Sequence, residues 1–356
     1  MNREAACETY RKESAVILQD GLKDLEKEYK AQEDRLKKEL FAAIREACAQ
    51  RLLSRPQLSL GYLQLSLLRS RMDEDIYLIM AALYDEHYFL DHSPTMTFID
   101  VSFIFKPLKA IREKLYQTAR NYQGKIEAFD ADRMIRETAM AFYKKKAEQM
   151  RSVFRDFDRL SCIQSLTRCP KLRVQWGEHK EKSETIFLSD CSKKDAQQFL
   201  PWNEKNTIHQ WNSKFVYQNW DGTRLEDLEV EQKNLLFLGM RDTRLEKCQW
   251  ERCMLHGASF REAELKQVIF AGCDLSASDF RGVQFLQVKF IQCNLSDADF
   301  TGAKLGEVEF TDSKMQNARF SRSALASHAL SAAQLQQVCL KEEPYVFYHG
   351  TGSENT

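Results

Sequence analysis

The sequence lacks an excess of charge of either sign. Its 356 residues include 52 lysines and arginines and 52 aspartates and glutamates, so the formal net charge is zero. This balance argues against a strongly basic nucleic-acid binder and against a strongly acidic mimic. No run of 18 apolar residues occurs, so we expect no transmembrane helix. Residues 1–13 are charged and lack the apolar core of a secretory signal, which predicts a cytoplasmic protein.

Motifs of catalysis and ligand binding are also missing. The sequence contains no Walker loop, no GxGxxG after a strand, no HExxH and no GxSxG. The ten cysteines fit neither a disulfide framework nor a CxxC metal site, and the seven histidines are scattered. We therefore expect free thiols, no metal, no cofactor, no catalytic residue and no enzymatic activity.

What the sequence does contain is a period of five. From Leu225 to Leu325 every fifth residue is apolar, and the residue two places earlier is small in most units. This period is neither that of a helix nor that of a strand, so the chain must turn a corner every five residues. Four units then make one coil, and the coils stack at roughly 4.8 Å. The predicted core positions are Leu225, Leu245, Trp250, Leu255, Phe260, Leu265, Phe270, Leu275, Phe280, Phe285, Phe290, Leu295, Phe300, Leu305, Phe310, Met315 and Phe320.

This pattern resembles the pentapeptide-repeat family, whose consensus unit is Ala-(Asp/Asn)-Leu-x-x. The best matching stretches are CDLSASDFRG from Cys273 and CNLSDADFTGAKL from Cys293. The resemblance implies a right-handed quadrilateral β-helix of five coils over residues 223–325. Cys248, Cys253 and the two cysteines just named occupy the small inward position, where we expect structural thiols.

Segments that cap this β-helix are expected on both sides. In residues 326–356, Ser331 predicts the N-cap of a short capping helix, followed by a flexible tail. The connector of residues 169–222 contains two stretches that predict a hairpin, and Trp220 falls in the repeat register one unit early, as an N-terminal cap would. The hairpin strands are expected at residues 171–178 and 184–188.

Residues 1–168 predict a helical arm with a small inserted β-sheet at about residues 57–91. Apolar residues at heptad spacing indicate one long helix over 14–53 and a second over 108–157. The two helices could pair with each other as a coiled-coil arm, or each could pair with another subunit. Alternating segments between them predict strands at residues 62–68, 76–84 and 87–90.

The fold class is therefore α+β and multidomain: a long-helix arm with a small β-meander, then a quadrilateral β-helix with a C-terminal capping helix. A β-helix has a filled axis and no pocket, so it offers outer faces rather than a catalytic cleft. We accordingly predict a non-enzymatic scaffold that binds another protein, with a homodimer expected through the C-terminal end of the β-helix or through the arm. Candidate contact residues are Arg252, Arg261 and Arg281 on the β-helix and Lys144, Lys145 and Lys146 on the arm.

Two alternatives stay open. Some proteins of the family protect gyrase by presenting an acidic, DNA-like rod, but residues 221–322 hold 17 acidic and 14 basic residues, fewer acids than a strong mimic needs. A contiguous acidic stripe on one face would favour that function. The other alternative is a bacterial effector that is exported without a signal and binds a host protein or membrane through its front domain.

Overall fold

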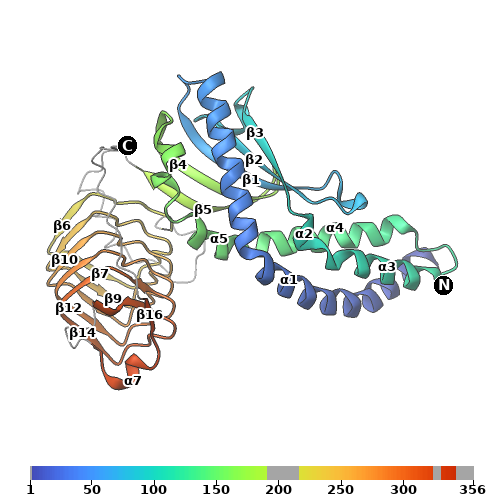
Figure 1. Cartoon of the computed structure of the whole chain (residues 1–356). Helices are drawn as coiled ribbons and strands as arrows, with labels where there is room; N and C mark the ends of the chain where they lie inside the picture. Colours follow the sequence, from blue (N-terminus) through green and yellow to red (C-terminus); the bar gives the residue numbers. More distant parts are fainter. Residues whose placement is uncertain (1, 191–215, 324–329, 342–356) are drawn as a thin grey trace. The chain divides into compact units, whose positions relative to one another are not determined.

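The computed structural model describes residues 2–190, 216–323 and 330–341 (Figure 1). The chain divides into two compact units, Met1–Ser189 and Asp190–Thr356, which are called the first and the second unit. Each has its own hydrophobic core.

A five-stranded sheet with the strand order β3-β2-β1-β4-β5 forms the centre of the first unit. β1, β2 and β3 form an antiparallel meander, and β1 pairs in parallel with β4. β1 and β2 lie inside the sheet and are buried along almost their whole length. β3 lies at the edge and alternates between buried and exposed residues, as expected for a strand with one solvated face. The strands are β1 (Leu60–Leu68), β2 (Leu78–Tyr84), β3 (Thr95–Asp100), β4 (Arg168–Gly177) and β5 (Ser183–Asp190).

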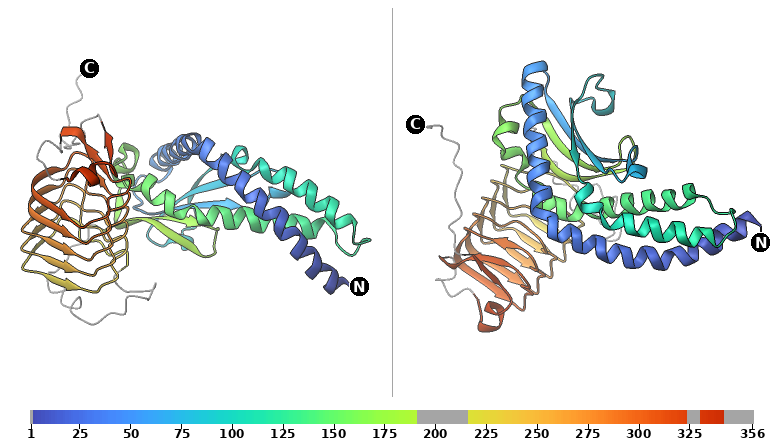
Figure 2. Two further views of the ribbon diagram at one scale, coloured as in Figure 1. Left: turned by 90° about the horizontal axis from the view of Figure 1, so that it is seen from below. Right: turned by 45° about the vertical axis from the view of Figure 1, so that its right-hand side comes forward.

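One long helix, α1, joins the arm of the first unit to this sheet. Its N-terminal half lies beside α3 and α4 (Figure 2), and its C-terminal half contacts β2 and β3. Gly21 allows the close approach of α1 to α3, because a Cβ atom at that position would lie 2.0 Å from the Cδ1 of Ile111. The helices are α1 (Arg3–Ser54), α2 (Ser102–Phe105), α3 (Pro107–Arg120), α4 (Ala128–Lys145), α5 (Ala147–Phe154) and α6 (Ser161–Gln164).

The first unit departs from the sequence-based expectation in three places. The first helix begins at Arg3 rather than near residue 14. The second helix is divided into α3, α4 and α5. The first break lies at Gln123 and Gly124, whose positive φ angles of 50° and 77° end a helical turn, and the second lies at Lys146. Residues 88–90 form a 3₁₀ turn, with Tyr88 at φ 56°, and the third strand of the meander is β3 instead.

The predicted hairpin exists, as β4 and β5, but it belongs to the sheet of the first unit rather than to a separate connector. Trp176 on β4 shows why. Its ring stacks on that of Tyr143 at 4.0 Å between centroids, and its indole N–H donates to the Tyr143 carbonyl. A segment with such a buried aromatic contact is part of the core.

The second unit is a parallel β-helix, as predicted. Residues 20 apart pair on successive rungs, for example Leu265 with Phe285 and Phe270 with Phe290. The strands are β6 (Arg224–Glu226), β7 (Glu229–Glu231), β8 (Arg244–Glu246), β9 (Gln249–Glu251), β10 (Glu264–Lys266), β11 (Ile269–Ala271), β12 (Gln284–Ile291), β13 (Asp299–Phe300), β14 (Lys304–Thr311), β15 (Arg319–Ser321) and β16 (Cys339–Lys341).

Phenylalanine side chains fill the axis of this β-helix in stacked columns. Phe260, Phe280, Phe300 and Phe320 stack with nearly parallel rings, their neighbouring centroids 5.1, 4.8 and 4.6 Å apart. All the predicted core positions of the repeat are buried. The residues that recur with the period of five in the sequence are therefore the ones that pack along the axis.

Both ends of the β-helix lie beyond residues 223–325. Asn219 already forms a bridge with Gly239, and β16 pairs with β15 as a further rung. The short helix α7 (Ala332–Leu335) begins at the predicted N-cap, where the Ser331 hydroxyl accepts from the Gln334 N–H. The predicted tail, residues 342–356, lies outside the described residues.

Cysteines in the β-helix wall have a structural role that serine can also fill. The Cys273 thiol lies 3.4 Å from the Trp250 carbonyl, 23 residues earlier in the chain. The Ser313 hydroxyl donates to the Phe290 carbonyl at the same spacing. Burial raises the pKa of the Cys248 thiol, so this thiol is a poor nucleophile at neutral pH.

Candidate functional site

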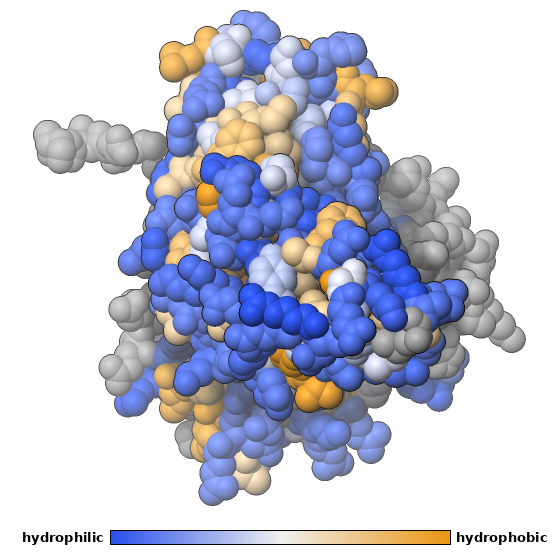
Figure 3. Space-filling view, turned by 90° about the vertical axis from the view of Figure 1, so that its right-hand side faces the viewer, coloured by the Kyte–Doolittle hydropathy of each residue, from blue (hydrophilic) through white to orange (hydrophobic). Residues whose placement is uncertain are grey.

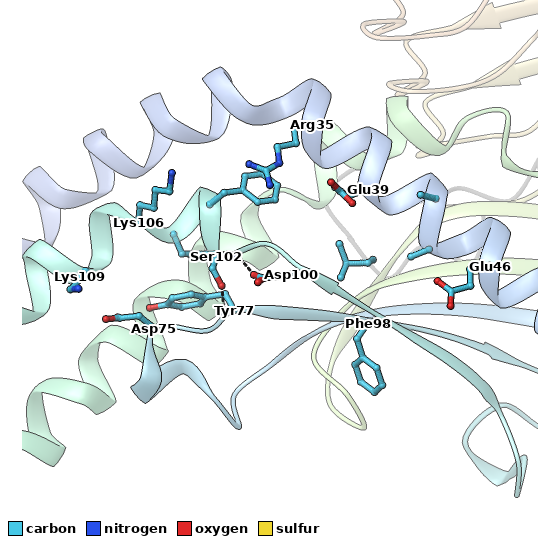
Figure 4. A pocket seen from close by; sticks show the side chains of 15 residues that line it. Arg35, Glu39, Glu46, Asp75, Tyr77, Phe98, Asp100, Ser102, Lys106 and Lys109 are labelled. Carbon is cyan, nitrogen blue, oxygen red and sulfur yellow. Dashed lines mark hydrogen bonds between the residues drawn. The ribbon is translucent and has the colours of Figure 1, made fainter.

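A groove of about 710 Å³ lies in the first unit between α1 and the segment that runs from β3 into α3 (Figure 4). Arg35, Glu39 and Glu46 reach it from α1, whereas Lys106 and Lys109 reach it from the start of α3. The groove thus combines segments that are far apart in the sequence. A concave site of this size is large enough to hold a ligand or a short stretch of chain.

A tight turn after β3 sets the shape of the groove. The Ser102 N–H donates to the Asp100 side chain at 2.9 Å, and the Ser102 hydroxyl accepts from the Tyr77 N–H at 2.9 Å. These two bonds end the strand and start α2, and Pro107 follows at the first position of α3, where its fixed φ suits a helix. The turn therefore carries the two lysines of the groove to the side that faces Arg35.

The end of the groove near this turn is basic. The Arg35 guanidinium lies 4.0 Å above the centre of the Phe103 ring, which orients it. Lys106 and Lys109 are exposed, and in the described part of the chain none of these three cations has a carboxylate within 4 Å. Asp75 and Asp100 also line this end. The Asp75 carboxylate is paired with Arg112 at 2.5 Å, and the Asp100 carboxylate accepts from the Ser102 N–H. Three cations against the one remaining carboxylate leave positive charge in excess here.

Tyr77 brings a buried hydroxyl to the same end. Its ring stacks on Phe105 at 4.5 Å between centroids, and only 1% of the residue is exposed. Arg112 lies beside the hydroxyl but can only donate, so the hydroxyl proton has no acceptor among the described residues. Burial raises the pKa of Tyr77 to about 12, so the group is a neutral donor at physiological pH.

The opposite end of the groove is lined by apolar and acidic residues of α1 and by the edge of β3. The Thr97 hydroxyl donates to the Ala43 carbonyl at 3.1 Å and fixes the helix to the strand. Ala42 and Glu46 are exposed on the helix side. Phe98 points away from the helix (Figure 4).

Large apolar side chains are exposed around the edge strand. Met96 and Phe98 on β3 are 40% and 58% exposed, and Leu90 in the preceding loop is 75% exposed. Figure 3 shows that hydrophobic side chains gather in the upper part of a face that is otherwise mostly hydrophilic. Exposed apolar groups beside a groove are typical of a surface that another molecule covers.

The candidate lysines predicted from the sequence are placed unequally. Lys146 is buried, its ammonium 2.6 Å from a Glu26 oxygen and 4.1 Å from the centre of the Tyr29 ring. Lys144 pairs with Glu178 at 3.2 Å. Only Lys145 is exposed in the way a contact residue would be.

The candidate arginines of the β-helix also differ. Arg252 is exposed and pairs with Glu231 and Glu251. Arg261 and Arg281 are buried, and only 4% and 8% of their surfaces are exposed, contrary to their expected outward exposure. The register places all three outside the axis, but the register alone cannot tell whether other parts of the chain cover an outer position.

Charges on the outer faces of the β-helix pair across rungs. Lys266 lies 2.7 Å from Glu246, and Lys289 lies 3.1 Å from Glu309. Arg244 pairs in the same way with Glu264 at 3.0 Å. Opposite charges therefore lie on neighbouring rungs at these three places, whereas Arg224 lies beside Arg244 and Glu226 beside Glu246.

Other kinds of site were searched within residues 2–190, 216–323 and 330–341. No group of three or more histidine, cysteine, aspartate or glutamate side chains there could hold a metal ion. No helix in the same described ranges is long and apolar enough to cross a membrane.

Comparison with known families identifies the β-helix. A model of the pentapeptide repeat region matches residues 243–320 and 263–340. The β-helix is a pentapeptide-repeat domain. The match covers this repeat domain and leaves the first unit without an assigned family. No curated protein matches the chain.

Solved structures give matches of limited extent. HetL from the cyanobacterium Nostoc sp. strain PCC 7120, a pentapeptide repeat protein involved in heterocyst differentiation regulation, is 19% identical, with a TM-score of 0.25 over 30% of this chain and 47% of HetL. A pentapeptide repeat protein from Cyanothece 51142 is 15% identical, with a TM-score of 0.24 over 28% of this chain and 86% of its own. QnrB1, a plasmid-mediated fluoroquinolone resistance protein, is 16% identical, with a TM-score of 0.20 over 36% of this chain and 90% of its own. This chain thus spans about half the length of HetL, and the matches reach about a third of this chain.

Proposed function

We propose that this protein is a non-enzymatic interaction protein in which the groove of the first unit recognises a protein partner. In this proposal the repeat domain is a rigid platform. The observation that carries it is the groove itself, because it combines exposed apolar side chains with a strand edge and cations that have no partner among the described residues. Aromatic and apolar anchors next to a polar rim are the usual composition of a protein interface.

The repeat domain supports the platform part of the proposal. Its axis is filled by stacked aromatic rings, so little bending is possible without breaking contacts in every rung. Three pairs of its outer charges are bonded across rungs, which leaves those six side chains less available for a partner. Such a domain suits a spacer better than a recognition surface.

A pair of tryptophan substitutions on α1 tests this proposal in the full-length protein. Ala42→Trp fills the groove from an exposed position, whereas Ala31→Trp adds the same bulk to the same helix outside the groove. Both variants and the unchanged protein are used to capture binding proteins from a native lysate, with cross-linking to map the contact. Loss of a captured protein in A42W but not in A31W is the expected result. If A42W, A31W and the unchanged protein capture it equally and the cross-links lie on the repeat domain, the partner is recognised by the repeat domain instead.

The gyrase-modulator function remains the second candidate. It requires an acidic stripe, and the basic residues that pair with acidic ones on the outer faces favour the interaction proposal over it. A supercoiling assay with purified gyrase tests it directly. Homodimerisation, cytoplasmic location and signal-less export stay predictions from the sequence.

A further inference from the structure

We infer that the groove binds an extended peptide that adds to β3 as a sixth strand and places a carboxylate at the basic end. This inference rests on the proposed function and names the chemistry of the partner. The proposed peptide site combines the outer hydrogen-bonding edge of β3 with the cluster formed by Arg35, Lys106 and Lys109.

The free edge of β3 supplies the backbone part of the recognition. β3 pairs with β2 on one side, and no described strand pairs with its other side. The Val101 N–H donates to the Tyr77 carbonyl at 2.9 Å, so Val101 belongs to a hydrogen-bonded pair of the antiparallel ladder. Since such pairs alternate with pairs that do not bond, Met96, Phe98 and Asp100 direct their N–H and C=O groups to the outer edge. An extended chain can bond to these groups in the way known for strand addition.

The length of the edge sets the length of the peptide. β3 contains six residues, which at about 3.3 Å per residue span roughly 20 Å. A peptide of about six residues therefore covers the edge from Thr95 to Asp100. Alternate side chains of that peptide would face α1 and the exposed side chains of Met96 and Phe98.

The charges of the groove favour a carboxylate at one end only. The three cations lie around the turn that follows Asp100, and the guanidinium of Arg35 is already oriented by Phe103. An arginine held in this way loses less freedom when it bonds to a carboxylate. Glu39 and Glu46, further along α1, repel a carboxylate placed toward the other end. The groove is thus expected to select peptides by both the sign and the position of their charge.

The Tyr77 hydroxyl gives an independent indication of a missing acceptor. It is a buried donor without an acceptor among the described residues, in the wall of the basic end. An unpaired buried donor costs about 1–3 kcal/mol, so such groups usually find an acceptor. A peptide oxygen entering this end is a candidate acceptor.

A selected-peptide experiment tests the inference with the full-length protein. A phage library of random dodecapeptides is selected on the immobilised chain, and enriched peptides are synthesised with a fluorescent label for anisotropy titration. We expect enriched sequences that alternate apolar residues and carry aspartate or glutamate at one fixed end. Exchange of that acid for lysine is expected to weaken binding at least tenfold.

Matched charge variants connect the peptide to the groove. The variant R35E/K106E/K109E is expected to weaken binding at least tenfold and to bind the lysine-exchanged peptide more tightly than the acidic one. The variant K27E/K38E/K114E changes exposed lysines outside the groove by the same total charge and is expected to bind like the unchanged protein. Circular dichroism of both variants checks that they are folded.

Four outcomes would overturn the inference. The first three are a library without enrichment, enriched peptides that lack an acid, and enriched peptides that bind the groove variant as tightly as the control variant. Competition by free glutarate as strong as by the peptide would also overturn it, because the site would then bind a small dicarboxylate. If one of these results is obtained and A42W still loses a captured protein, the inferred peptide ligand is wrong, whereas the proposed function is supported.

Discussion

The two units of this protein build their cores in opposite ways. In the repeat domain, neighbours in space are 20 residues apart, and every rung repeats the contacts of the one before. In the first unit, the core joins α1, the sheet and the later helices through contacts that no repeat dictates. A regular core leaves a filled axis and even faces, whereas an irregular one leaves a groove. The comparison explains why recognition is proposed for the first unit.

Removing one ring from the aromatic column is the change with the largest expected effect. Phe280→Ala deletes a fully buried side chain that stacks on Phe260 and Phe300, so we expect the repeat domain to lose about 3–5 kcal/mol of unfolding free energy. Urea unfolding of the full chain followed by circular dichroism measures it. Lys289→Ala, on an exposed position, is the control and is expected to cost less than about 1 kcal/mol. A small effect of F280A would show that the column is not the main support of the domain.

The first unit contains an acid-sensitive contact. Hydrogen bonds from Arg69 and Lys144 lower the pKa of Glu178 to about 2. Because the folded pKa lies below the unfolded value of about 4.3, this stabilisation is present above pH 4.3 and is lost as the pH falls toward 2. Glu178→Gln is expected to lower the unfolding free energy by about 1–2 kcal/mol at pH 7 and to flatten its decline between pH 4.3 and 2. An unchanged pH profile in E178Q would contradict this.

A small residue on α1 tests how tightly the arm is packed. Gly21→Ala improves helix propensity by about 1 kcal/mol, yet the new methyl group would meet Ile111. We expect a net destabilisation of about 1 kcal/mol in thermal unfolding, since the clash with a buried side chain outweighs the propensity. In a double-mutant cycle, Ile111→Ala should make G21A stabilising. If G21A stabilises the unchanged protein, the arm is looser than described.

Tyr77→Phe is the one change expected to raise stability. It removes a buried hydroxyl whose proton has no acceptor among the described residues, so the unfolding free energy is expected to rise by about 1 kcal/mol. The same substitution is expected to weaken binding of a selected peptide. A loss of more than about 1 kcal/mol of stability without peptide would mean that the hydroxyl is already satisfied within the fold.

The parts of the structure that follow from local sequence could be predicted. A period of five is visible without knowledge of any distant contact, and the rungs and the buried aromatic positions follow from it. The Ser331 cap follows from the local preference of serine for the start of a helix. The predicted helix over residues 14–53 is present because the spacing of its apolar residues is also a local pattern. Its start at Arg3 is harder to predict, because apolar spacing is weaker there.

The groove could not be predicted, since its walls come from residues far apart in the chain. Arg35, Tyr77 and Lys106 meet only after α1 has crossed the sheet and β3 has turned into α2. Nothing in the sequence distinguishes these cations from other surface charges. The run Lys144–Lys146 illustrates the reverse error, because one member of that apparently exposed run is buried against Glu26 and Tyr29.

The exact pairing of residues 20 apart has a consequence for how this protein can change its length. An insertion of 20 residues would add one rung, lengthen the domain by about 5 Å and return every later residue to its own face. An insertion of five residues would turn all later rungs by a quarter of a circle and present a different side to any molecule bound there. Variation in length is therefore tolerated in whole coils, while variation by single units reorients everything that follows.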